Sequence, residues 1–224
     1  MGLLGVALVA RSGYSLAALE SFIFCALLVA IAFIDIDTFT VPDSLVGLLA
    51  VNGLLFGGLR LAVGDLDRDA FYGRLIGAVA AFVVLGAIIV VATGLLRRTR
   101  RAAPYFQRFP RIQAYLQARE LPQDEWAMGW GDPLIMIGIG AHLGWQLLPI
   151  TLFLASVQGS IVGMVLLPLG KLKHAAPVAP DDDWIPPAGA VPFGPFLALA
   201  ALEAAFFSSQ LNGWLVQILG LDQF

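Results

Sequence analysis

Long apolar stretches separated by short polar segments run through the whole chain. About 20 residues at ~1.5 Å rise per residue cross a ~30 Å hydrocarbon core, so stretches of this length indicate membrane-spanning helices. Helices are expected rather than a barrel, because a helix satisfies its own backbone hydrogen bonds and the chain lacks ten-residue alternation. The pattern therefore predicts an all-α polytopic integral membrane protein with six transmembrane helices. Their expected ranges are 14–34, 45–64, 72–96, 133–148, 149–169 and 191–211, with a tight turn at 147–150.

The composition supports the same class of protein. Of the 224 residues, 59% are hydrophobic and 13% are charged, and the mean hydropathy is +0.84, which exceeds what a soluble domain needs. The single cysteine, Cys25, excludes an internal disulfide and a zinc site built on paired cysteines. We therefore expect residues 1–224 to form one membrane-embedded domain, surrounded by lipid, with no cofactor, metal or nucleic-acid partner.

The distribution of basic residues predicts the orientation. If the N-terminus lies outside, the inner loops are 35–44, 97–132 and 170–190, and these hold nine of the 13 Lys and Arg residues. Cytoplasmic loops of membrane proteins carry an excess of such residues. The bias therefore predicts that both termini lie outside (N-out/C-out) and that Asp35 lies on the cytoplasmic side.

Two of these inner loops contain recognisable features. The loop 97–132 has apolar side chains at helical spacing with basic residues between them. This pattern predicts a helix on the membrane surface at about 111–120, with a solvated linker as the alternative. The loop 170–190 contains three adjacent aspartates at 181–183, which either attract a basic substrate segment or form an ordinary solvated charge run.

Four carboxylates lie where the predicted spans meet water. Asp35, Asp37 and Asp43 fall within nine residues between the first two spans, and Asp132 opens the fourth span. A charge at this depth is costly unless it is partnered or functional, so each is a candidate site residue. Taken alone, Asp35 could be an interfacial carboxylate, and Asp132 could be a helix cap before Pro133.

Asp35 and Asp132 have complementary chemistry if they meet. Two carboxylates that share a site do not both ionise easily, so one acts as an acid and the other as a base. Asp35 lies at the negative end of its helix dipole and Asp132 at a positive end. We therefore expect Asp132 to start as general base on a water and Asp35 as acid toward a scissile carbonyl, within one coupled pair. Gly129 and Gly131 let another segment approach Asp132 closely.

Four short segments, spread along the chain, form a characteristic series of motifs. They read IDIDTFTVPD at 34–43, GWGD at 129–132, GAHLGW at 140–145 and VPFGPF at 191–196. In these segments the chain resembles the type IV prepilin peptidases, which are GxGD-type intramembrane aspartic proteases, over about residues 14–210. The resemblance implies an aspartic endopeptidase that cleaves the basic leader from type IV prepilins or type II secretion pseudopilins, just before their hydrophobic N-terminal helix. It implies that the reaction takes place at the cytoplasmic face of the bacterial inner membrane.

The resemblance also implies roles for particular residues. Asp35 and Asp132 match the two catalytic aspartates of the family. Asp37 and Asp43 match motif positions that could hold water or the basic residues of the leader, and Asp43 could instead cap the second span.

Two features depart from the family pattern. Leu134 stands where the family often has a lysine, two residues after the GxGD aspartate. Larger bacterial members carry an N-terminal region with two cysteine pairs together with an N-methyltransferase activity, and this sequence shows no such region. We therefore expect the peptidase half alone.

Two other functions stay open on the sequence. Buried Asp, Glu and His also line ion pathways, so the same carboxylates could serve a small proton- or ion-coupled membrane transporter, with Glu203 and His142 deeper in the membrane. A structural scaffold with capped helix ends is the third possibility. A transporter needs titratable groups stepped across the bilayer, whereas Asp35 and Asp132 are expected on one side.

Overall fold

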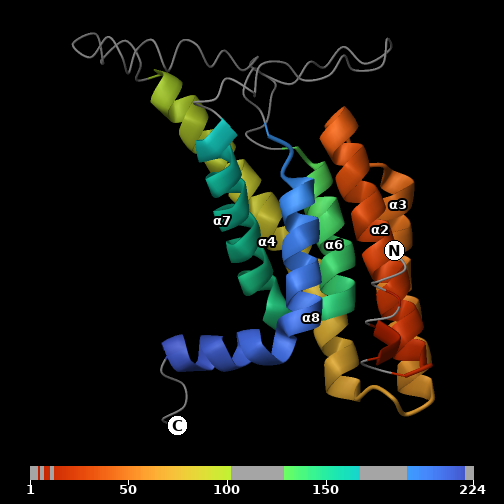
Figure 1. Cartoon of the computed structure of the whole chain (residues 1–224). Coiled ribbons are helices and arrows are strands. Elements are labelled where there is room, and N and C mark those ends of the chain that lie inside the picture. The colour runs from red at the N-terminus through yellow and green to blue at the C-terminus, as the bar shows by residue number, and fades with distance from the viewer. Residues whose placement is uncertain (1–4, 6–7, 11–12, 102–128, 167–190, 220–224) are drawn as a thin grey trace.

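The described part of the chain is a bundle of helices, and none of its residues lies in a strand (Figure 1). The computed structural model describes residues 5, 8–10, 13–101, 129–166 and 191–219. Its elements are α2 (Leu16–Thr38), α3 (Asp43–Ala62), α4 (Arg68–Arg101), α6 (Gly131–Leu143), the short 3-10 helix η2 (Trp145–Leu147), α7 (Leu148–Leu166) and α8 (Gly194–Leu219). The predicted all-α class is confirmed, whereas the predicted surface helix at 111–120 and the acidic run at 181–183 lie outside the described residues.

Four helical segments are long and apolar enough to cross a membrane. They are Leu16–Thr38, Asp43–Ala62, Arg68–Leu95 and Trp145–Leu166. The other two predicted spans are shorter, because α6 has 13 residues and the apolar part of α8 ends at a kink at Phe207. Beyond this kink α8 turns aside and projects away from the bundle (Figure 1). The predicted count of six full spans is therefore not confirmed.

The connection between α6 and α7 differs from the expected one. α6 stops at Gly144, whose φ of 79° is a backbone conformation that glycine adopts without strain. The chain turns through η2, and α7 begins at Leu148. Pro149 therefore lies in the first turn of α7, where its missing N–H costs no hydrogen bond. The turn predicted at 147–150 is wrong, because glycine and not proline ends the preceding helix.

α6 lies inside the bundle. It packs against α3, α4 and α8, and its residues Ile135, Met136 and Ile139 are all 0% exposed. A Cβ atom on Gly140 would overlap the backbone of Gly77 in α4, so the absence of side chains lets these two helices touch. Thirteen residues cover only about 20 Å of a ~30 Å core. A helix this short is tolerated at membrane depth because protein, rather than lipid, surrounds its ends.

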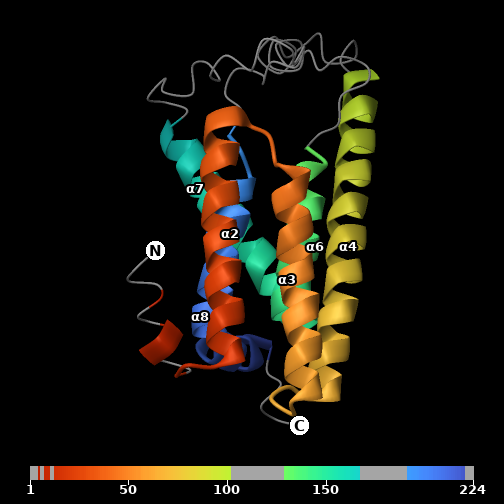
Figure 2. The same ribbon diagram turned by 90° about the vertical axis from the view of Figure 1, so that its right-hand side faces the viewer.

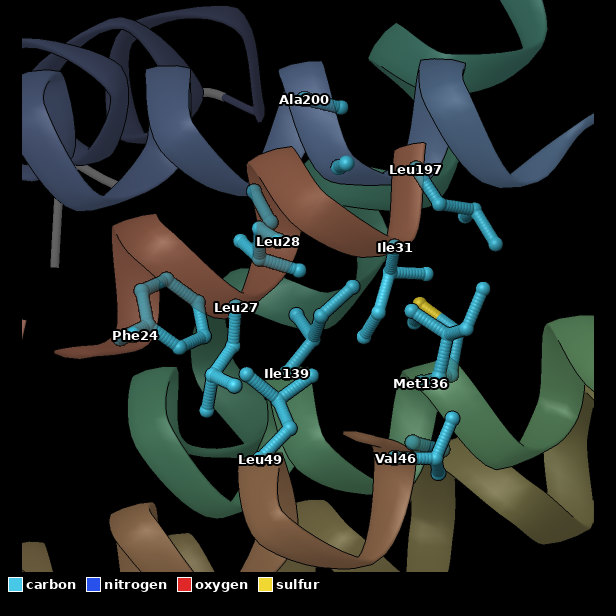
Figure 3. Packing of buried hydrophobic residues seen from close by; sticks show 14 of the residues in the cluster. Phe24, Leu27, Leu28, Ile31, Val46, Leu49, Met136, Ile139, Leu197 and Ala200 are labelled. Atoms are coloured by element: carbon cyan, nitrogen blue, oxygen red, sulfur yellow. The ribbon is translucent and has the colours of Figure 1, made fainter. Parts of the chain in front are cut away.

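The hydrophobic core forms where four helices meet (Figure 3). Leu28 and Ile31 of α2, Leu49 of α3, Met136 of α6 and Leu197 of α8 point toward one another and are fully buried. These contacts fix α6 relative to α2, although the two helices are far apart along the chain.

The outer faces of α3 and α4 are apolar and exposed. Leu55 is 55% exposed, and Val79, Val83 and Val91 are 66%, 58% and 59% exposed. Water-soluble proteins rarely expose contiguous apolar faces of this kind. The faces suit a lipid environment, in agreement with the hydropathy of the sequence.

Candidate active site

Asp35 lies in the last turn of α2. This helix begins after Ser15, whose hydroxyl oxygen accepts a hydrogen bond from the N–H of Ala18, and it runs four residues beyond the predicted end, to Thr38. Phe39 then adopts a left-handed conformation with φ of 54°, and its N–H donates to the Asp35 carbonyl oxygen. Asp35 is only 5% exposed. The extra helical turn therefore directs this carboxylate into the protein rather than into solvent.

Asp132 is the second residue of α6, which begins at Gly131. The N-cap position belongs to Trp130, and no side chain caps the helix there. The alternative in which Asp132 merely caps the helix is therefore wrong. Asp132 is 8% exposed, and the positive end of the helix favours a carboxylate in its first turn. Pro133 fits beside it because the first N–H groups of a helix have no intrahelical acceptor.

The two carboxylates lie at the same end of the bundle. The end of α2 and the beginnings of α3, α6 and α8 all lie at this end (Figure 1 and Figure 2). The Cβ position of Gly194 lies 3.2 Å from Cγ of Asp35 and 3.2 Å from Cδ1 of Ile135, which is three residues after Asp132 in α6. The Asp35 carboxylate therefore lies beside the first turn of α6, near enough for its charge to affect Asp132. Two buried carboxylates in this arrangement can share a proton and divide the roles of acid and base.

Backbone segments from two other parts of the chain approach this pair. Gly194, at the start of α8, lies against the Asp35 carboxylate, because a Cβ atom on this glycine would overlap Oδ2 of Asp35. The α2–α3 connection packs on the start of α6, where a Cβ on Gly131 would lie 2.8 Å from Cγ2 of Val41. Only glycine permits that approach. Gly129 is exposed with open space around it, so the expected close approach is found at Gly131 and not at Gly129.

Asp37 and Asp43 follow Asp35 closely in the sequence, but their side chains lie on the surface. Both residues are exposed. α3 begins at Asp43 itself, with Pro42 at the N-cap position and no side-chain capping hydrogen bond, so the predicted cap is not formed. Within the described ranges, no group of three or more His, Cys, Asp or Glu side chains is placed to hold a metal ion.

Comparison with known proteins identifies the family. The family described as the type IV leader peptidase family matches residues 22–164, a stretch that contains both buried aspartates. This chain belongs to the type IV leader peptidase family.

Its relatives in this family carry the name prepilin leader peptidase/N-methyltransferase. One from Aeromonas salmonicida is 31% identical over 189 residues, which cover 84% of this chain and 48% of that protein. One from Burkholderia pseudomallei is 30% identical over 214 residues, covering 93% and 52%. One from Myxococcus xanthus is 27% identical over 271 residues, covering 99% and 70%. The chain thus spans about half the length of most of these leader peptidase relatives. No solved structure matches it.

Two titratable groups of this leader peptidase family member lie away from the aspartate pair. Glu203 of α8 accepts a hydrogen bond from Nε2 of Gln158 in α7, at 2.7 Å. Nδ1 of His142 lies 3.1 Å from Oε1 of Glu20, although it is not aligned for a hydrogen bond, and the imidazole stacks on Phe24 with ring centroids 3.8 Å apart. Both groups contact neighbouring helices, as groups with a packing role would.

A second buried charge cluster, centred on Glu20, was not expected from the sequence. Glu20 is 0% exposed, its Oε2 accepts a hydrogen bond from Nη1 of Arg60 at 2.9 Å, and its Oε1 accepts one from Nη1 of Arg74. Glu20 precedes Asp35 by 15 residues on the same helix, or ~22 Å, so the cluster lies toward the opposite end of the bundle. The available signal was a carboxylate inside the apolar stretch 14–34, which requires a buried partner.

Proposed function

We propose that this chain is an aspartic endopeptidase that removes the basic leader from type IV prepilins or type II secretion pseudopilins, with Asp35 and Asp132 as its catalytic pair. Membership of the leader peptidase family supports the reaction class. The observation that supports the residues is that two carboxylates, Asp35 of α2 and Asp132 of α6, are both buried at the same end of the bundle, with Asp35 beside the start of α6. The proposal concerns the peptidase reaction and treats residues 1–224 as one membrane-embedded domain.

The chemistry follows from the coupling of the two carboxylates. The ionised member of the pair accepts a proton from a water molecule as the water oxygen attacks the scissile carbonyl carbon. The protonated member donates its proton to the carbonyl oxygen, which gives a neutral tetrahedral intermediate. The carboxyl group that took the proton from water then donates it to the leaving nitrogen, the other carboxylate takes a proton from a hydroxyl of the intermediate as the carbonyl re-forms, and the carbon–nitrogen bond breaks to release the leader. Asp35 and Asp132 act in this scheme as one titrating unit.

The proposed orientation places the catalytic pair at the cytoplasmic face of the bacterial inner membrane, with both termini outside. Arg97 and Arg98 are exposed near the C-terminal end of α4. This end of α4 lies at the same end of the bundle as Asp35 (Figure 2). The excess of basic residues in loops that join the helices on this side supports a cytoplasmic location.

The exposed acidic residues near the pair suit the proposed substrate. Asp37 and Asp43 are exposed at the end of the bundle where Asp35 is buried. Carboxylates there would attract the basic leader electrostatically. The hydrophobic helix that follows the cleavage site would remain in the surrounding lipid while the leader peptide bond reaches the two aspartates.

Co-expression with a prepilin tests the proposal. Asp35→Asn and Asp132→Asn should each lower the rate of leader removal by about 10²–10⁴-fold, because each removes one partner in proton transfer. Asp69→Asn makes the same chemical change at an exposed residue in the first turn of α4, at the other end of the bundle, and should leave cleavage unchanged. If both active-site variants still shorten the prepilin on a gel, the proposed function is wrong.

A further inference from the structure

The start of α8 has one backbone donor directed at the active site. Phe196 and Leu197 both donate their N–H groups to the carbonyl oxygen of Phe193, and Pro195 has no N–H to donate. The N–H of Gly194, the first residue of the helix, is therefore left for an acceptor outside the helix. The side chain nearest to this glycine is the carboxylate of Asp35, which is placed to accept such a bond.

The missing side chain of Gly194 matters as much as its N–H. A Cβ atom at this position would overlap Oδ2 of Asp35, and it would lie 3.2 Å from Cγ of Asp35 and 3.2 Å from Cδ1 of Ile135. The carboxylate thus occupies the volume that any other residue at 194 would fill. Asp35 keeps its place beside Asp132 only while that volume is free.

We propose that Gly194 is a positioning residue for Asp35, which holds the carboxylate beside Asp132 with its N–H and makes room for it by lacking a side chain. The consequence for cleavage rests on the proposed function, whereas the contact itself does not. Because the carboxylate is the movable end of a side chain, an added methyl group should displace it without unfolding the bundle. The inference therefore predicts a protein that folds but has its catalytic pair out of alignment.

A disulfide tests the contact independently of any peptidase activity. In a Cys25→Ala background, which removes the only natural cysteine, Asp35→Cys and Gly194→Cys are combined. A Cβ atom at 194 would lie 3.2 Å from Cγ of Asp35, and the Cβ atom of Asp35 is one carbon–carbon bond from that Cγ. The two Cβ atoms are therefore close to the ~3.5–4.5 Å separation that a disulfide requires. We expect mild oxidation to protect both thiols from a maleimide label. The pair Asp35→Cys with Gly163→Cys is the control, since nothing lies within 4 Å of a Cβ at 163.

Gly194→Ala tests the effect on catalysis. We expect kcat to fall about 10²-fold with KM nearly unchanged and with the thermal midpoint within a few degrees of the wild type, because a small misplacement of a reacting group has an effect of this size. Gly163→Ala is the matched control and should leave all three values unchanged. Ile135→Val removes the Cδ1 atom that the new methyl group would also meet, and combining it with Gly194→Ala should not restore kcat.

Three outcomes would overturn the inference. They are a failure of the two cysteines to join, full activity of Gly194→Ala, and recovery of kcat by Ile135→Val, which would reduce Gly194 to a packing residue. A wild-type protein that cleaves no prepilin defeats the proposed function instead, and the disulfide then decides the Gly194–Asp35 contact by itself.

Discussion

Removing the charge of Glu20 should strongly destabilise the folded bundle. Both carboxylate oxygens of Glu20 are used, because Arg60 donates to one, and Arg74 donates to the other, which His142 also approaches to 3.1 Å. The Glu20 side chain is 0% exposed, and those of Arg60 and Arg74 are 15% and 10% exposed. Glu20→Gln keeps the shape of the side chain but leaves Arg74 without its charged partner in a buried site.

The size of the effect follows from this burial. Breaking a buried ion pair by removing one partner costs about 3–5 kcal/mol, because the remaining charge stays desolvated without compensation. Arg60 also binds Asp65 at 2.8 Å, but the Asp65 side chain is 49% exposed. An exposed pair contributes only ~0–1 kcal/mol. Asp65→Asn therefore serves as the matched control, since it removes a carboxylate from the same arginine in a solvated setting.

The free energy of unfolding can be measured in mixed micelles as the fraction of denaturing detergent is raised. We expect Glu20→Gln to lower it by about 3–5 kcal/mol and Asp65→Asn by less than ~1 kcal/mol. The double variant Glu20→Gln with Arg74→Gln should lose less than the sum of the two single losses, because the two residues are in contact. Equal losses for Glu20→Gln and Asp65→Asn would show that the buried charges do not hold the helices together.

Two further predictions concern helix packing and proton transfer. Gly140→Ala should lower the free energy of unfolding by about 1–3 kcal/mol, because the added methyl group meets the rigid backbone of Gly77. Gly94→Ala is the control and should leave this free energy unchanged, because a Cβ atom at 94 has open space around it. Similar losses for both variants would contradict the close α4–α6 contact. The rate of prepilin cleavage should fall at both low and high pH, because Asp35 and Asp132 must carry one proton between them, and a profile with a single titrating limb would rule out the shared proton.

The sequence pointed to Asp35 and Asp132 as candidate site residues, but it did not point to the groups that surround them in the structure. Asp35 and Asp132 stand out in the sequence because a carboxylate at the edge of an apolar stretch is unusual. Gly194 lies in the VPFGPF segment that carries the resemblance, but a glycine before a proline at a helix start has many structural explanations, so nothing in the sequence linked it to Asp35. Glu20 carried a signal, but the arginines that neutralise it lie in α3 and α4, and no local pattern links them to α2.

The sequence by itself determined that this protein consists of apolar helices and that acidic groups lie at the ends of some of them. Hydropathy, helix length and the position of a charge are properties of single segments, so they can be read along the chain. Only the tertiary structure decided that α6 is a short buried helix, that Glu20 meets two arginines and that Gly194 contacts Asp35. These features depend on how closely helices from distant parts of the chain approach, which is set by packing across the whole bundle.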